Sequence, residues 1–254
     1  MSVYTCYDMV ADCKSGKAEG YAFLVRQIVP ALRLLVKHYG GDEASLRALI
    51  VSLRAMEDLE PVGEREFVAR VRPRVLECCR FRPGEAQSLD PAVFEEALEE
   101  LTFLERQLVW CETMGCDSAE SARRLRVSPE TAVRAREKAL ELLRGKMDAW
   151  NRSVITDNAG TLVGHARRTP PAEPIPFRRY LDFIDGRLTW QNREEVERLV
   201  SASWYEVDQL CVVREADDAV QGARPLEADE AAGYLDLLGV KPPRRSFWKR
   251  LVRG

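Results

Sequence analysis

The stretch from Leu101 to Met147, LTFLERQLVWCETMGCDSAESARRLRVSPETAVRAREKALELLRGKM, decides how the rest of the chain is interpreted. Ser118 can cap a short helix with a narrow apolar face, and Ser128 followed by Pro129 is a strong start signal for a second helix. Only a tight segment of three residues separates the two. The spacing therefore predicts a helix-turn-helix preceded by further helical sequence.

The second of these helices divides into an apolar face and a basic face. Small or apolar residues recur along it at helical spacing, while Arg134, Arg136 and Lys138 lie on other faces. Residues 118–147 hold eight Arg or Lys and four Glu, an excess of +4 in a chain of net charge -3. Such a helix can pack on one side and meet DNA phosphates on the other. An ordinary solvated helical hairpin would have the same composition, so that alternative stays open.

The residues of this stretch resemble region 4, the C-terminal DNA-binding domain of extracytoplasmic-function (ECF) sigma factors of bacterial RNA polymerase. The positions that match the family pattern are Leu101, Arg106, Glu120, Ala122, Leu125, Val127, Ser128, Thr131, Lys138, Ala139 and Leu143. The resemblance implies that the second helix contacts the promoter's −35 element through Thr131, Val133, Arg134, Arg136 and Lys138. Arg126 stands where the family usually has glycine, and a left-handed turn there would cost about 1 kcal/mol.

The N-terminal third has three apolar seams that could close one helical core. Asp8-Met9-Val10, Lys14-Ser15-Gly16 and the helix from Tyr21 to Tyr39 are similar to the opening of ECF sigma region 2, and Pro30 should kink or restart that helix. In the family the next helix docks on polymerase. The resemblance assigns this docking to Leu46, Leu49, Ile50 and Leu53, although the acidic residues expected beside them are absent.

The third N-terminal helix carries arginines where the family melts and recognises the −10 element. Arg70, Arg72 and Arg74 could hold phosphates, but few aromatic side chains are available to stack on flipped bases. A helical domain that has lost promoter melting is the alternative.

The sequence after Trp150 changes character. Residues 151–176 lack sustained periodicity and predict a tether, Phe177 to Ile184 predicts a short helix, and Thr189 to Leu210 predicts one long helix. In outline this resembles a zinc-binding anti-sigma domain. The three metal positions of that family, however, align with Leu199, Ser203 and Glu206, so we expect no metal site and a core closed by apolar side chains instead.

This extension is acidic. Residues 203–239 contain nine acids and two arginines, a net charge of -7. A tethered acidic domain can shield basic domains of the same chain, so we expect intramolecular contact between the extension and the sigma-like domains, and stronger DNA or polymerase binding once residues 151–254 are removed. A plain solvated acidic face would explain the same count.

The helical patterns and the resemblance predict an all-α protein with two small helical domains and a third small helical extension, and a composition of 254 residues with 46% apolar and 31% charged side chains agrees with two or three small domains. The expected parts are a region 2-like domain (1–82), a linker (83–92), a region 4-like domain (93–150), a tether (151–176), the extension (177–240) and a basic tail (241–254). Seven cysteines are expected as buried thiols, with a redox or metal switch at Cys111 and Cys116 as the minor alternative. The sequence contains no catalytic constellation, phosphate loop or apolar run of transmembrane length, so we expect a cytoplasmic non-enzyme without a cofactor.

These patterns and the resemblance together predict a bacterial ECF-type sigma factor that binds core RNA polymerase and promoter DNA, with a regulatory extension. The docking helix lacks the expected acidic residues and the third helix has few aromatic residues for promoter melting. The chain could therefore also be a sigma-derived adaptor that no longer initiates transcription. A DNA-binding regulator that acts without polymerase is the third alternative.

Overall fold

The computed structural model describes residues 3–79, 96, 99–146, 159–243 and 247. Within those residues the regular structure is helical and contains no strand, which confirms the predicted all-α class. The chain divides into two compact units, residues 1–81 with 215–254, and residues 82–214. The expected linker at 83–92 lies outside the described residues, as does most of the expected basic tail.

The first unit is built from the N-terminal helices α1 (Cys6–Lys14), α2 (Ala18–Phe23), α3 (Val29–His38), α4 (Glu43–Ser52) and α5 (Glu64–Cys78). Its core is continuous and apolar, with Met9, Leu24, Ile28, Leu32 and Phe67 fully buried. The hydroxyl of Thr5 caps α1 and the carboxylate of Asp42 caps α4, which fixes where these helices start. The predicted three-helix core is therefore present, with α5 continuous through Pro73.

Pro30 restarts the helix, as its missing N–H requires. A π-helical segment, η1 (Leu24–Ile28), precedes α3, and Pro30 lies in the first turn of α3. In an α-helix the carbonyl of Arg26 would accept from the N–H of residue 30, which proline lacks. The backbone N–H of Leu226 donates to that carbonyl instead, at 2.9 Å. A residue 200 positions away in sequence thus satisfies a group that the proline leaves open.

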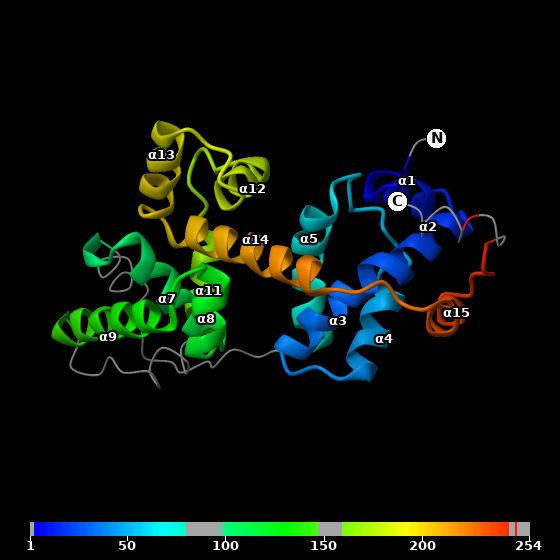
Figure 1. The fold of residues 1–254 in the computed structure, drawn as a ribbon, viewed down its shortest axis with the longest axis horizontal. Coiled ribbons are helices and arrows are strands. Elements are labelled where there is room, and N and C mark those ends of the chain that lie inside the picture. Colours follow the sequence, from blue (N-terminus) through cyan, green and yellow to red (C-terminus); the bar gives the residue numbers. More distant parts are fainter. Residues whose placement is uncertain (1–2, 80–95, 97–98, 147–158, 244–246, 248–254) are drawn as a thin grey trace. The chain divides into compact units, whose positions relative to one another are not determined.

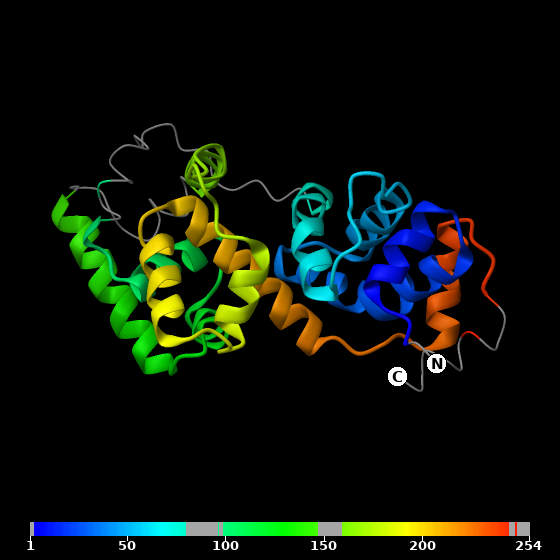
Figure 2. The same cartoon turned by 90° about the horizontal axis from the view of Figure 1, so that it is seen from above.

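The C-terminal part of this unit covers the N-terminal helices. It comprises residues 215–222 of α14 (Trp204–Gly222), a connecting segment and α15 (Ala228–Leu237). α15 contacts α2, η1 and α4, and both views show it beside the N-terminal helices (Figures 1 and 2). Leu226, Ala231, Leu235 and Leu238 are buried there. We call residues 215–240 the C-terminal strap.

The second unit contains α7 (Phe103–Thr113), α8 (Ser118–Leu125), α9 (Pro129–Lys146), α11 (Ala159–Arg168), α12 (Phe177–Ile184), α13 (Trp190–Val200) and residues 204–214 of α14. α7, α8 and α9 pack on one another, and α13 packs on α7. The indole rings of Trp110 and Trp204 stack with their centroids 5.8 Å apart, and the Trp110 N–H donates to buried Asp208 at 3.1 Å.

Three predictions about the C-terminal half need correction. The expected tether at 151–176 contains the helix α11, whose Leu162, Val163 and Ala166 are buried. The expected single helix from Thr189 is two, because α13 ends at Val200 and α14 starts at Trp204 and continues to Gly222. Residues 177–240 are shared between the two units rather than forming a third one.

The region that resembles a zinc-binding domain is closed by apolar packing, as expected. Val200, Trp204, Val207 and Leu210 are fully buried. Glu206, which aligns with a metal-binding cysteine, is buried too. It accepts hydrogen bonds from the Tyr180 hydroxyl and, at 3.1 Å, from the N–H of Ile175. Burial raises the pKa of Glu206 to about 7.

This buried carboxyl predicts a pH-dependent stability of the second unit. Because the pKa of Glu206 is higher in the folded state than in the unfolded chain, folding is favoured at low pH. The free energy of unfolding should fall by about 3 kcal/mol as pH rises from about 4.5 to about 7 and then level off. Glu206→Gln should remove this dependence in urea titrations followed by tryptophan fluorescence. The exposed Glu194→Gln should retain it, and a wild-type profile in both variants would contradict the prediction.

Candidate nucleic-acid interface

The helix-turn-helix of the second unit forms where the sequence predicts it. Asp117, rather than Ser118, caps α8, with its carboxylate accepting from the Glu120 N–H at 2.8 Å. The Ser128 hydroxyl accepts from the Thr131 N–H at 3.1 Å and starts α9, as expected.

The turn between α8 and α9 is left-handed at Arg126. Its φ of 56° makes it the one non-glycine residue with positive φ among the described residues. The N–H of Val127 donates to the carbonyl of Ala122 at 3.1 Å, which completes a Schellman ending for α8. A non-glycine residue in a left-handed conformation costs backbone energy. The hydrogen bond that the Arg126 guanidinium donates to the Ile184 carbonyl, at 2.8 Å, offsets part of this cost. Arginine at this position therefore also ties the turn to the end of α12.

The predicted DNA-contacting residues occupy different environments on α9. Arg134 projects into solvent with 80% of its side chain exposed, and its nearest acid is Glu130, one turn earlier at 3.7 Å. Thr131 is exposed at the start of the helix and Val133 is half-buried. Of the predicted apolar face, Ala132, Ala139 and Leu143 are buried and Ala135 is half-buried.

Arg136 and Lys138 hold the three helices together rather than standing free. The Arg136 guanidinium donates to the Ser118 hydroxyl at 2.7 Å, across α8 and α9. The Lys138 ammonium lies 3.1 Å from the buried carboxylate of Glu105, across α7 and α9, and remains 63% exposed. Burial alone would raise the pKa of Glu105, but the hydrogen bonds from Thr102 and the pairing with Lys138 lower it. Of the three basic residues predicted to contact DNA, Arg136 and Lys138 bind residues of neighbouring helices, whereas the ion pair of Arg134 is with a residue of its own helix.

The predicted polymerase-docking residues of the first unit are core residues. Leu46, Leu49, Ile50 and Leu53 are buried at 0–1% exposure, so they are not available to a partner and this prediction is corrected. The reason is helical phase, because these residues form the stripe of α4 that packs against α3 and α5. The exposed face of α4 carries Ala44, Arg47, Ala48 and Val51.

The predicted phosphate-contacting arginines of α5 are engaged within the protein. Arg72 is buried and pairs with Glu215, so its assignment to phosphate is corrected. Arg74 donates to the Ser52 and Ala55 carbonyls at 2.9 and 3.2 Å. Arg70 pairs with Glu60 and Glu66 at 3.2 and 2.7 Å. These three side chains brace the segment between α4 and α5 and the strap.

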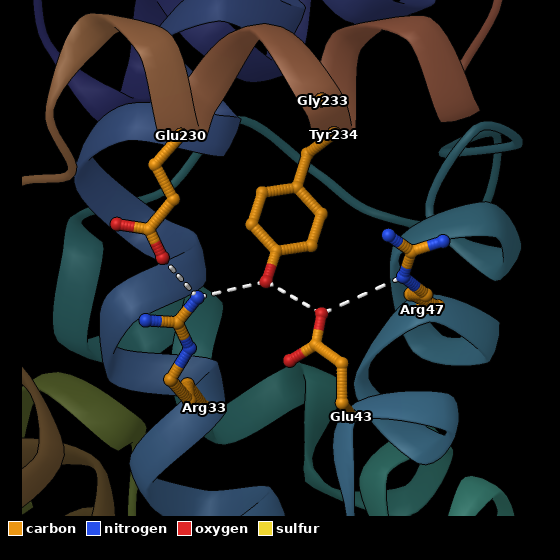
Figure 3. A pocket seen from close by; sticks show the side chains of 6 residues that line it. All are labelled: Arg33, Glu43, Arg47, Glu230, Gly233 and Tyr234. Carbon is orange, nitrogen blue, oxygen red and sulfur yellow. Dashed lines mark hydrogen bonds and ion pairs between the residues drawn. The ribbon is translucent and has the colours of Figure 1, made fainter.

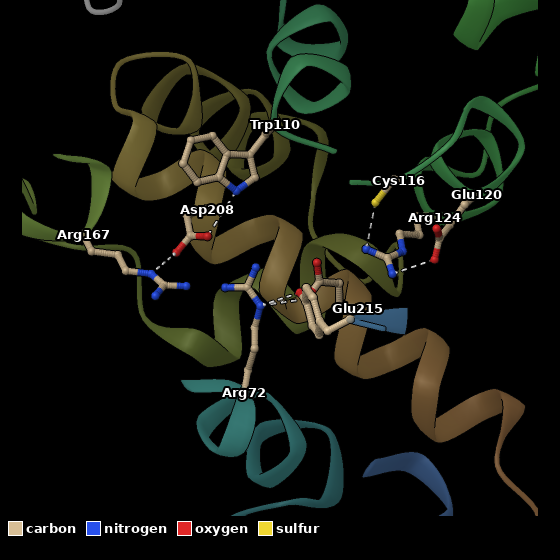
Figure 4. Close-up of polar contacts among 9 residues, drawn as sticks. Arg72, Trp110, Cys116, Glu120, Arg124, Arg167, Asp208 and Glu215 are labelled. Carbon is tan, nitrogen blue, oxygen red and sulfur yellow. Dashed lines mark hydrogen bonds and ion pairs between the residues drawn. The ribbon is translucent and has the colours of Figure 1, made fainter. Parts of the chain in front are cut away.

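Glu215 is one of the residues through which the C-terminal strap holds the N-terminal helices of its unit. Its carboxylate lies 2.8 Å from the Arg72 guanidinium and accepts from the Tyr39 hydroxyl at 2.6 Å, with Arg72 and Glu215 each only 2% exposed (Figure 4). Arg72 also donates to the Tyr39 hydroxyl at 2.9 Å. Two residues further along α14, Asp217 pairs with Arg65 at 2.9 Å. Burial raises the pKa of Tyr39 well above its ordinary value, so the phenol stays a donor.

A second polar contact joins α15 to α3 and α4. The Arg33 guanidinium donates to Glu230 at 2.6 Å and to the Tyr234 hydroxyl at 2.7 Å (Figure 3). The Tyr234 hydroxyl in turn donates to Glu43, in the first turn of α4, at 2.8 Å. These residues line a shallow pocket with Arg47. The strap therefore reaches the helix that the resemblance associates with polymerase.

The contacts of Glu215, Asp217 and Tyr234 were not identified from sequence. The acidic character of the extension was the only signal, and it fits the observed pairing with Arg72, Arg65 and Arg33. These pairs join the C-terminal strap to the N-terminal helices of the same unit. Which arginine meets which acid depends on tertiary contacts between residues more than 140 positions apart.

Comparisons of the chain with protein-family models, with curated proteins and with solved structures gave no match. Among the helices that the structure describes, none is long and apolar enough to cross a membrane.

Proposed function

We propose that this chain is an ECF-type sigma factor that acts in the bacterial cytoplasm, binding core RNA polymerase through its first unit and −35 promoter DNA through α9. The helix-turn-helix carries the proposal. α8, a left-handed turn and α9 form a packed helix pair that exposes Arg134 on the second helix, and such a helix can enter the major groove.

The basic residues of α9 have different proposed roles in DNA binding, according to the contacts that each makes within the protein. Arg134 is the proposed direct contact, with Thr131 at the exposed start of α9 beside it. Arg136 and Lys138 hold α8 and α7 in place and keep their charge near the same surface. Replacing all three would mix lost contacts with lost packing, so Arg134 is the residue to change.

Arg134→Ala should weaken binding to duplex DNA and reduce the slope of log K against log salt by about 0.9, the effect of one lost phosphate contact. Arg178→Ala is the matched control, because Arg178 is 70% exposed in the same unit and also pairs with an acid one turn away. Fluorescence anisotropy with a promoter duplex between low and moderate salt measures both. An unchanged slope for Arg134→Ala, or an equal loss for Arg178→Ala, would contradict the assignment.

The strap is the proposed regulatory part of the extension. Tyr234 binds Glu43 at the start of α4, so α15 would restrict access to the exposed face of that helix. The double variant Tyr234→Phe with Glu230→Ala removes these polar contacts and keeps the aromatic ring. It should bind core polymerase more tightly than wild type in a co-elution or biolayer experiment, whereas Asp229→Asn on the exposed side of α15 should not. Equal affinity of the double variant and wild type would contradict a restraining role.

A sigma-derived adaptor is the second candidate, favoured by one observation. The apolar stripe of α4 and Arg72 of α5 are both used inside the protein, which leaves few exposed groups for polymerase docking and strand melting. Co-elution of the full-length chain with core polymerase from its host separates the two candidates. Binding supports the sigma factor, and duplex binding without polymerase binding supports a polymerase-independent regulator. Neither kind of binding supports the adaptor.

A further inference from the structure

Three buried thiols of the second unit lie next to one another. Cys111 lies in α7, Cys116 in the turn before α8 and Cys211 in α14, and each is 3–4% exposed. The side chain of Cys111 interacts with those of both Cys116 and Cys211, and together with burial this raises the pKa of the Cys111 thiol well above its ordinary value. None of the three forms a disulfide in the structure. We call them the thiol cluster, and the proposed DNA contact makes no use of it.

The end of α7 explains why Cys111 and Cys116 meet. Gly115 has a φ of 80°, and the Cys116 N–H donates to the Cys111 carbonyl at 2.9 Å. This is the Schellman ending of a helix, in which the side chains at these two positions come into contact. Helix α14 contributes the third thiol, so the cluster contains one residue from the extension and two from the helix-turn-helix region.

A cation lies against one of the sulfurs. The Arg124 guanidinium donates to Cys116 Sγ at 3.2 Å and to Glu120 at 2.9 Å (Figure 4). Arg214 donates to the Arg124 carbonyl at 3.3 Å, which links α14 to the same helix. A guanidinium beside sulfur stabilises the thiolate, the form that reacts with peroxides and the better leaving group in thiol exchange. Cys116 is thereby distinguished from the other two thiols.

We propose that the thiol cluster is an oxidation site at which a peroxide generates a disulfide between Cys111 and Cys211, joining α7 to α14 covalently. This inference does not depend on the proposed function, because it concerns only the chemistry of the second unit.

The reaction proceeds in three balanced steps. The Cys116 thiolate attacks the peroxide oxygen, the O–O bond breaks, and Cys116 sulfenic acid and one hydroxide result; the proton that the Cys211 thiol loses in the third step converts this hydroxide to water. Cys111 then attacks the sulfenic sulfur and releases a water, which gives the Cys111–Cys116 disulfide. Cys211 attacks Cys111 and displaces Cys116 as a thiolate beside Arg124. The sum consumes two thiols and one hydrogen peroxide and yields one disulfide and two waters.

The test is hydrogen peroxide treatment of the reduced full-length protein, followed by differential alkylation and peptide mass spectrometry. Cys6 and Cys13 are internal controls, since they are equally buried neighbours in the first unit. The expected result is a Cys111–Cys211 disulfide while Cys6 and Cys13 stay reduced. The thermal midpoint of the protein should rise on oxidation and return with dithiothreitol.

Three variants separate the proposed chemistry from mere proximity. Arg124→Ala should slow disulfide formation about tenfold, and Arg124→Lys should restore part of the rate because it keeps the cation. Cys116→Ala should slow the reaction while leaving Cys111 and Cys211 in place. The proposal is overturned if the cluster is alkylated as completely as Cys6 and Cys13 after peroxide, if the disulfide joins two chains, or if Cys116→Ala reacts at the wild-type rate.

Discussion

Glu215→Ala should destabilise the first unit by about 3–5 kcal/mol, the cost of leaving a buried charge without its partner. Arg72 and Glu215 are each 2% exposed and 2.8 Å apart, and the Tyr39 hydroxyl donates to the same carboxylate. Removing the carboxylate leaves a guanidinium and a phenol in the core with one acceptor fewer. Thermal or urea unfolding of the full-length chain measures the loss, which is a large fraction of a typical domain's stability.

A matched pair of variants shows whether burial is the cause. Glu197→Ala breaks a 3.0 Å pair with Arg193 on the surface of α13, and it should cost less than about 1 kcal/mol. The double variant Arg72→Met with Glu215→Leu should recover most of the loss, because it leaves no unpaired charge in the core. Equal costs for Glu215→Ala and Glu197→Ala would show that the buried pair has no special role.

A chain that ends at Arg214 should keep a folded second unit and lose cooperative unfolding of the first. The deleted strap contributes the buried side chains Leu226, Leu235 and Leu238, and burial of each side chain of this size is worth about 1.5–3 kcal/mol. The deletion also removes Glu215 from Arg72 and the Leu226 N–H from the Arg26 carbonyl. Hydrogen exchange followed by mass spectrometry should show protection lost in α3 to α5 and retained in α7 to α9.

A single substitution provides a milder version of the same test. Leu235→Ala should cost about 2–5 kcal/mol of unfolding free energy, because Leu235 is fully buried, whereas Leu237→Ala at a half-buried position of the same helix should cost less.

Full protection of α3 to α5 from hydrogen exchange in the chain ending at Arg214 would show that the N-terminal helices fold without the strap. The expected loss means that deleting residues 151–254 does not separate regulation from folding. The Tyr234 and Glu230 double variant serves that purpose better.

The sequence by itself determined the starts of several helices. Ser128-Pro129 and Thr189 carry local capping signals, and α9 and α13 start there. Pro30 likewise determined a restart of the helix, because its missing N–H acts within one turn. Such signals depend on neighbouring residues, so they can be recognised without knowing the fold.

Only the tertiary structure decided how the polar and apolar faces are used. Leu46 and Ile50 were predicted to dock a partner and lie in the core, while Arg72 was predicted to contact phosphate and binds Glu215. Arg136 and Lys138 have the spacing of DNA contacts, yet they bind Ser118 and Glu105. The reason is physical. Helical periodicity determines which residues share a face, but the partner of that face is set by long-range packing, which brings Glu215 and Tyr234 to arginines more than 140 residues away.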